Sequence, residues 1–169
     1  MKYTFFFFLF FGFFLGVHAQ YNGIASGSVD FTFVEKEVEG SVSGFVSTSK
    51  IDWNDLENSI MEGYVLSETL KTGNFIRDWS LKGEKYFDTD TFPRISFKST
   101  TIEEKGDGIL VNGILTLKGI SKQIEIQFDK KGKNLQGTTT LFTTDFDITI
   151  FKKSREANKV ELQFQLTLE

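Results

Sequence analysis

Apolar and polar residues alternate along most of the chain from Ser26 onward, and residues that favour turns separate the alternating runs. This two-residue period is typical of β-strands with one buried face, because successive side chains of a strand point to opposite sides. The clearest run spans residues 160–168, where every second residue is a large apolar one. Similar runs predict strands at residues 28–33, 39–46, 59–67, 94–102, 109–118, 123–128, 135–142 and 160–169, with a charged hairpin loop at residues 129–134.

One stretch between the third and fourth predicted strands breaks this rhythm. Asn74 follows a turn and is a suitable N-terminal cap, so residues 74–82 are predicted to form a short helix. On that helix Phe75, Trp79 and Leu81 are expected to share one side.

The predicted strands need a shared interior in which their apolar faces are buried together. The pattern therefore predicts an all-β fold, an eight-stranded antiparallel barrel with a short helical insertion. Closure into a barrel also removes the unpaired edges of a sheet. A β-sandwich remains an alternative at this point, because both architectures bury one face of each strand and periodicity does not distinguish them.

The N-terminal residues have the features of a secretory signal peptide. Lys2 supplies the positive charge, residues 5–17 form an almost unbroken apolar run, and Val17-His18-Ala19 is a small-x-small cleavage site. A membrane anchor is the alternative, but the run has 13 residues, whereas a spanning helix needs about 20. We therefore predict a signal peptide at residues 1–19 and a barrel domain at residues 20–169, periplasmic or secreted, with no integral membrane span after cleavage.

Composition removes many kinds of chemistry from consideration. The chain has no cysteine, and its one histidine, His18, lies within the predicted signal peptide. The other residues therefore provide no cysteine or histidine ligand for zinc or haem and no histidine for a catalytic triad. The formal net charge of −4 gives no attraction to nucleic acid or to anionic lipid headgroups, so no nucleic-acid partner is expected. We also expect no cofactor.

Three acidic clusters suggest carboxylate catalysis or calcium binding. They are Asp52 with Asp55, Asp88 with Asp90, and Asp145 with Asp147. None has the spacing of a complete calcium-binding loop, and Asp145 and Asp147 would repel each other on one face of a strand. The sequence therefore predicts no metal site and no catalytic residue.

Three segments, in order along the chain, resemble the motifs of the YceI-like family. The first is residues 72–99, the second is residues 111–122, VNGILTLKGISK, and the third is residues 144–148, TDFDI. In the first segment the matching positions are Thr72, Gly73, Arg77, Asp78, Leu81, Tyr86, Phe87, Asp88, Phe92, Pro93, Ile95, Phe97 and Ser99. The resemblance extends from about Ser28 to Leu168.

The resemblance implies a lipocalin-like barrel with a helical insertion, a periplasmic or secreted location, and the binding of long isoprenoid chains, as in isoprenoid quinones and polyprenyl phosphates. The chain departs from the family motifs at three places. Ser80 stands at the family's histidine, Thr143 or Thr144 at its arginine, and Asp147 at its glycine. If those residues hold a polar head group, this chain is expected to bind a different head or to bind it more weakly.

The strand faces and the predicted helix together supply the candidate ligand-binding residues. The strands would line a cavity, Arg77 and Asp78 would orient the polar end of a ligand, and Phe75 and Trp79 would cap the barrel mouth. Structural roles, in an ion pair or in helix packing, are the alternative for these four residues. The complete set is Phe31, Phe33, Phe75, Arg77, Asp78, Trp79, Phe97, Val111, Leu115, Ile126, Phe128 and Phe164.

We therefore expect an exported protein that holds an apolar, isoprenoid-like lipid of quinone or polyprenyl type inside its barrel, without catalysis. Two other functions remain open. One is an enzyme that acts on a small apolar substrate with Asp, Glu, Lys, Arg or Tyr alone. The other is a stress-related or interaction protein whose barrel is filled by its own side chains. A homodimer is also compatible with this sequence.

Overall fold

The computed structural model of the protein describes residues 21–152 and 154–169. The predicted signal peptide, residues 1–19, lies outside the described residues. Short 3-10 turns connect several elements: η1 (Val34–Lys36), η2 (Leu56–Asn58), η3 (Ser67–Thr69), η4 (Thr143–Phe146) and η5 (Glu156–Asn158). The described part also contains one helix and nine strands: α1 (Phe75–Lys82), β1 (Ile24–Phe33), β2 (Val38–Val42), β3 (Val46–Ser47), β4 (Glu62–Leu66), β5 (Arg94–Lys105), β6 (Gly108–Leu117), β7 (Ile120–Lys131), β8 (Asn134–Phe142) and β9 (Lys159–Leu168).

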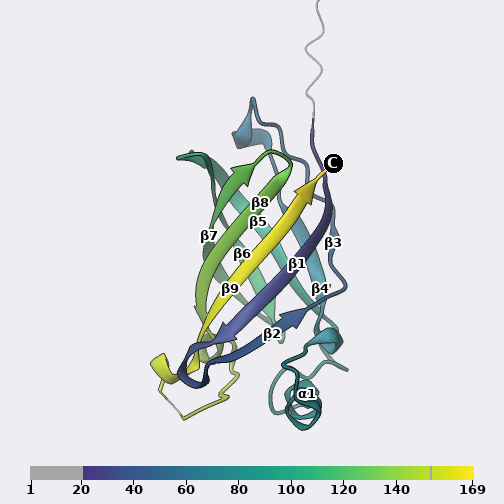
Figure 1. The fold of residues 1–169 in the computed structure, drawn as a ribbon, viewed down its shortest axis with the longest axis vertical. Coiled ribbons are helices and arrows are strands. Elements are labelled where there is room, and N and C mark those ends of the chain that lie inside the picture. Colours follow the sequence, from purple (N-terminus) through teal and green to yellow (C-terminus); the bar gives the residue numbers. More distant parts are fainter. Residues whose placement is uncertain (1–20, 153) are drawn as a thin grey trace, which may run out of the picture.

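All nine strands of the described residues belong to a single antiparallel sheet in the order β2-β1-β9-β8-β7-β6-β5-β4-β3. The sheet curls around an interior, as Figure 1 shows. The predicted antiparallel barrel is therefore confirmed and the sandwich, which needs two sheets, is not formed. The predicted number of strands, eight, is one too few, because the predicted strand at residues 39–46 divides into β2 and β3. Gly44 lies at the division with a φ of +72°, a left-handed conformation that turns the chain away from β2.

The predicted hairpin loop at residues 129–134 is wrong in its extent. β7 continues to Lys131 and β8 begins at Asn134, and these two residues are paired across the ladder. Charged residues can continue a strand wherever they face water, and Asp129 and Lys131 are both exposed. The turn itself consists of Gly132, with a φ of +61°, and Lys133.

The two edges of the sheet meet along a seam that contains few ladder hydrogen bonds. At one end Asn22 and Ile51 exchange backbone hydrogen bonds of 2.8 and 3.0 Å. Further along, Ser41 and Lys71 exchange bonds of 2.9 and 3.0 Å, and the amide of Leu66 donates to the carbonyl oxygen of Ser43 at 2.9 Å. These bonds join the edges, so the interior is enclosed although β2 and β3 are not paired with each other.

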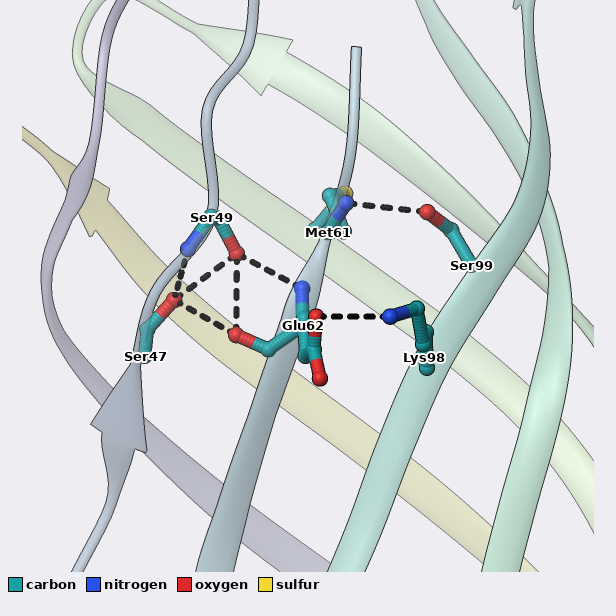
Figure 2. A network of polar contacts seen from close by, with 6 residues as sticks. All are labelled: Ser47, Ser49, Met61, Glu62, Lys98 and Ser99. Carbon is teal, nitrogen blue, oxygen red and sulfur yellow. Dashed lines mark hydrogen bonds and ion pairs between the residues drawn. The ribbon is translucent and has the colours of Figure 1, made fainter.

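Serine hydroxyls continue the wall where β3 ends after two residues (Figure 2). The Ser49 hydroxyl accepts a hydrogen bond from the Glu62 amide at 3.0 Å. The Ser47 hydroxyl donates to the Ser49 hydroxyl at 2.7 Å or to the Glu62 carbonyl oxygen at 3.1 Å. On the far side of β4, the Met61 amide donates to the Ser99 hydroxyl at 2.9 Å. Backbone hydrogen bonds also continue this edge, from the Thr48 amide to the Glu62 carbonyl oxygen at 2.9 Å and between Lys50 and Ile60 at 2.8 Å, so the hydroxyls supplement the ladder.

The end of the barrel near the C-terminus is closed by packed apolar side chains. Its fully buried residues come from the seam, from β6 and from β8, and include Ile51, Ile109, Val111 and Leu135, none more than 1% exposed. The opposite end carries α1, η1 and the segment from η4 to η5 (Figure 1). We refer to these as the closed end and the α1 end.

Candidate functional site

An apolar cavity of about 920 Å³ occupies the barrel interior. Pockets for small ligands usually measure about 300–1,000 Å³, so this one is at the large end. Its wall is built mainly from the inward positions of the strands: Val29, Phe31, Phe33, Val65, Ile95, Phe97, Leu115, Leu117, Ile124, Ile126, Phe128, Leu141, Val160, Leu162, Phe164 and Leu166. Several of these, such as Phe31, Ile95 and Leu162, are only half-buried although they face inward, because the interior is not filled. A barrel filled by its own side chains is therefore contradicted.

Pairs of phenylalanine and glycine help to explain how a wall with large rings leaves this space. The ring of Phe128 lies over Gly137, that of Phe31 over Gly40, and that of Phe97 over Gly113, each glycine on a neighbouring strand. A methyl group at any of these glycines would overlap the ring. Because glycine has no side chain, the rings can lie along the sheet instead of crossing the barrel.

The mouth of the cavity is marked by lining residues that are also exposed to solvent. Among the described residues there are five, and all lie on η1 or in the α1 region: Lys36, Asn74, Ile76, Arg77 and Ser80. Phe151 also lines the cavity beside η1, where the ammonium of Lys36 lies 3.9 Å from the centre of its ring. The cavity therefore opens at the α1 end.

The structure places eight of the twelve predicted site residues on the cavity wall: Phe31, Phe33, Arg77, Phe97, Leu115, Ile126, Phe128 and Phe164. Val111 does not line the cavity and is instead fully buried at the closed end. Phe75, Asp78 and Trp79 do not line it either.

Helix α1 forms where it was predicted, and Phe75 and Trp79 share one side of it, but Leu81 does not. The side chain of Asn74 caps it by accepting a hydrogen bond from the Arg77 amide at 3.0 Å. Leu81 is the buried residue of the helix, whereas Phe75 and Trp79 are largely exposed. Leu81 is about 120° from Phe75 around the helix, at about 100° per residue, and faces the barrel. The expectation that Phe75 and Trp79 cover the mouth is corrected, because the helix turns Ile76 and Ser80 toward the cavity instead.

Arg77 and Asp78 do not form an ion pair with each other but bind a common partner, Thr72. The amide and the hydroxyl of Thr72 both donate to Asp78 Oδ1. Arg77 Nε donates to the Thr72 hydroxyl at 2.6 Å, and Nη2 donates to the Thr72 carbonyl oxygen at 2.9 Å. The structural alternative therefore holds for Asp78, while Arg77 both anchors the helix and reaches the cavity mouth.

Several cavity residues were not predicted from the sequence. Lys36 and Phe151 lie in turns and continue no strand pattern, whereas Ile150 continues an alternation with Phe146 and Ile148 that did not by itself indicate the mouth. The available signal was the alternation of Phe146, Ile148 and Ile150, followed directly by Phe151. The polar wall residues Ser47, Ser49 and Ser96 are not distinguishable from outward serines by composition.

Members of two of the three acidic clusters make local structural contacts. Asp145 accepts two hydrogen bonds from the Arg155 guanidinium, at 2.9 and 2.8 Å, and these bonds lower the pKa of its carboxyl group. Asp52 accepts from the Asn54 amide at 2.9 Å, and Asp55 caps η2. Among residues 21–152 and 154–169 no group of three or more acidic, histidine or cysteine residues is placed to hold a metal ion.

None of the helices in the described ranges is both long and apolar enough to span a membrane.

Comparison with known proteins identifies the fold and its relatives. The family profile of the YceI-like domain matches residues 23–168. A UPF0312 protein of Shewanella oneidensis is 35% identical over 85 residues, which are 44% of this chain and 44% of that protein. The alignment thus spans less than half the length of this curated relative.

Two solved structures have the same fold. The crystal structure of Burkholderia cenocepacia BcnA superposes with a TM-score of 0.72 at 19% identity, over 85% of this chain and 96% of the other. A polyisoprenoid binding domain from Saccharophagus degradans, implicated in plant cell wall breakdown, superposes with a TM-score of 0.57 at 11% identity, over 88% and 97%.

Proposed function

The chain belongs to the YceI-like family, and on this premise we propose that it is an exported carrier that holds an isoprenoid-like lipid, of quinone or polyprenyl type, inside its barrel. The observation that carries the proposal is the open interior of about 920 Å³ behind an almost wholly apolar wall. The likeness to a solved polyisoprenoid binding domain supports the same ligand class.

Affinity for such a ligand comes from burial of hydrocarbon. Each methylene that leaves water contributes about 0.8 kcal/mol, so a chain of a few isoprene units can bind without a strong polar contact. The half-buried wall residues Phe31, Ile95, Leu162 and Phe164 are the surfaces that such a chain would cover. Binding would then be a partition from lipid into the barrel, with no covalent step.

The polar end of the ligand would lie at the mouth. Arg77 and Lys36 both line that end and are both exposed. Two nitrogens of Arg77 bind Thr72, while Nη1 has no hydrogen-bond partner among the described residues. A phosphate or a quinone carbonyl oxygen could accept a hydrogen bond from Nη1.

Extraction of the protein purified from its native host tests the ligand class. We expect organic extraction and mass spectrometry to release a polyprenyl species in near-stoichiometric amount. The variant Leu162→Trp, which adds bulk to the cavity wall, is expected to retain the fold and lose most of this lipid. The matched control is Gln163→Trp, on the outward face of the same strand, which should keep it. Equal lipid content in both variants, or no isoprenoid in the unmodified protein, would overturn the proposal.

A further inference from the structure

Helix α1 presents the three most exposed large apolar side chains of the described residues. Phe75 is 84% exposed, Ile76 76% and Trp79 74%, and the next such residue, Tyr21, is 48% exposed. At about 100° per residue the three side chains fall within an arc of about 100° on one face of the helix. We call this set, Phe75, Ile76 and Trp79, the apolar crest. Exposed apolar groups of this size are unusual unless they bind something.

The apolar crest adjoins the cavity mouth. Ile76 belongs to both, since it is an exposed crest residue and also lines the cavity. Arg77 and Ser80, which follow it around the helix, line the mouth as well. In Figure 1 the helix stands at the α1 end, away from the closed end where the C-terminus lies. An apolar surface therefore continues from the outside of the protein into the barrel.

We propose that the apolar crest is a membrane-docking surface that inserts into the interface of a lipid bilayer and brings the cavity mouth against it. The proposal rests on the proposed function, because a ligand of long hydrocarbon chains is poorly soluble in water and resides in membranes. Docking of the mouth on the bilayer would let such a chain pass into the barrel without crossing water, which would otherwise cost about 0.8 kcal/mol for each exposed methylene.

The chemistry of the crest and of its surroundings fits a bilayer interface. Tryptophan and other aromatic residues favour the headgroup region, where a ring can be buried beside polar groups. The cations Lys36 and Arg77 flank the mouth and could face lipid phosphates. The one acidic residue of the described cavity wall, Glu62, begins β4 and is paired with Lys98 at 3.2 Å. The cavity lining at the mouth therefore offers two cations to lipid phosphates, while the exposed Glu35 and Glu37 beside Lys36 lie outside that lining.

The attachment of α1 keeps Phe75 and Trp79 turned outward and leaves Ile76 at the edge of the mouth. Leu81 is buried on the opposite side of the helix, and Thr72 binds both Arg77 and Asp78. The crest residues take no part in these contacts. Replacing Phe75 and Trp79, which do not line the cavity, should therefore leave the helix and the cavity intact.

Flotation with phospholipid vesicles free of isoprenoid tests the docking surface. The probes are vesicles of phosphatidylcholine alone and of phosphatidylcholine with phosphatidylglycerol. We expect the unmodified protein to float with both, and Phe75→Ser/Trp79→Ser to bind at least about tenfold more weakly, given the apolar area lost. The matched control Ile114→Ser, which removes an exposed apolar residue of β6, should bind like the unmodified protein.

Fluorescence gives a second readout of the same contact. In a Trp53→Phe background Trp79 is the one tryptophan, since the chain has two. Its emission should shift to shorter wavelength when vesicles are added. No shift and no flotation of the folded protein would overturn the docking proposal.

Two further measurements separate this proposal from its alternatives. Titration with farnesol, a short isoprenoid alcohol, in the absence of vesicles reports on the cavity alone and should be unchanged in Phe75→Ser/Trp79→Ser. Farnesol binding without vesicle binding would refute docking and leave the proposed function. Vesicle binding without farnesol binding would refute the proposed function and leave docking.

Light scattering tests whether the crest is instead the contact with a second copy of the chain. A dimer that the double variant converts to a monomer would overturn membrane docking.

Discussion

The aromatic ring of Phe128 lies over Gly137, which is its direct partner across the ladder between β7 and β8. A β-carbon at Gly137 would overlap the ring, so the ring can lie against the sheet only because this position is glycine. Phe31 and Gly40 repeat the arrangement, and the Phe97 ring lies over Gly113, which is the ladder partner of Ser99. The size of the cavity therefore depends on small residues that are not themselves part of its apolar wall.

Gly137→Ala is expected to push the Phe128 ring into the interior. Overpacking of this kind usually lowers the free energy of unfolding by about 1–3 kcal/mol, and the displaced ring should also reduce lipid capacity. Denaturant unfolding and lipid extraction measure the two effects. The control is Gly83→Ala, where the nearest atom to an added β-carbon is the Ser80 carbonyl oxygen at 3.4 Å. Equal stability of the two variants would contradict the importance of the Phe128–Gly137 contact.

Alternation along the strands was sufficient to predict most of the sheet, because nearly every strand buries one face. β9 follows the predicted pattern from Val160 to Leu168 without exception. The pattern failed where a strand is interrupted or prolonged without a change in polarity. Gly44 interrupts a run that still alternates, and Lys130 prolongs one that looks like a loop. In both cases the backbone conformation and the partner strand decide the boundary, and neither is visible in the local sequence.

Site residues on strands could be predicted better than those on the helix and the turns. Eight of the twelve predicted residues line the cavity, seven of them on strands. Strand alternation tells which face is inward but not how far along the barrel the packed end extends, which is why Val111 was misplaced. For α1, the sequence shows two candidate faces, and burial of Leu81 rather than Phe75 or Trp79 follows from the direction in which the helix docks.

Thr72→Val is expected to loosen α1. The substitution removes the hydroxyl that donates to Asp78 and accepts from Arg77 Nε, while the backbone contacts of Thr72 remain. Hydrogen bonds to charged groups contribute about 1.5–3 kcal/mol, and exposure of Arg77 places the expected loss near the lower value. Amide hydrogen exchange of residues 75–82 should become faster. Thr91→Val, at an exposed threonine with no side-chain hydrogen bond among the described residues, is the control. Unchanged exchange in Thr72→Val would show that Leu81 alone holds the helix.

Asn158→Ala is expected to release the segment that carries Phe151 at the mouth. The fully buried Asn158 accepts hydrogen bonds from the amides of Ile150 and Phe151 at 2.8 and 2.9 Å. Its amide group donates to the carbonyl oxygens of Phe151, Lys152 and Ser154 at 2.8 to 2.9 Å. Loss of these partners should lower the free energy of unfolding by about 2–4 kcal/mol.

Thermal or denaturant unfolding measures this loss, and limited proteolysis shows whether cleavage moves to residues 150–155. Asn54→Ala is the control, because Asn54 is exposed and only its backbone amide is hydrogen-bonded. If both variants were equally stable, the segment would be held by its apolar residues and not by Asn158.

Asp145→Asn is expected to change the dependence of stability on pH. The Arg155 guanidinium lowers the pKa of Asp145 in the folded protein, chiefly through its hydrogen bonds, with a smaller attraction from Lys122. In the unfolded chain the carboxyl group titrates near its usual value of about 3.9. Because the folded pKa is the lower one, the ionised carboxylate stabilises the fold fully above about pH 4, and this stabilisation is lost as the pH falls through the folded pKa. The unmodified protein should therefore be more stable than Asp145→Asn at about pH 6, and the difference should shrink toward about pH 3.

Denaturant unfolding at several pH values measures this difference in stability. Repeating the substitution in an Arg155→Gln background should remove most of the difference. A difference that is the same at every pH would mean that the carboxylate charge of Asp145 contributes nothing through its pairing with Arg155.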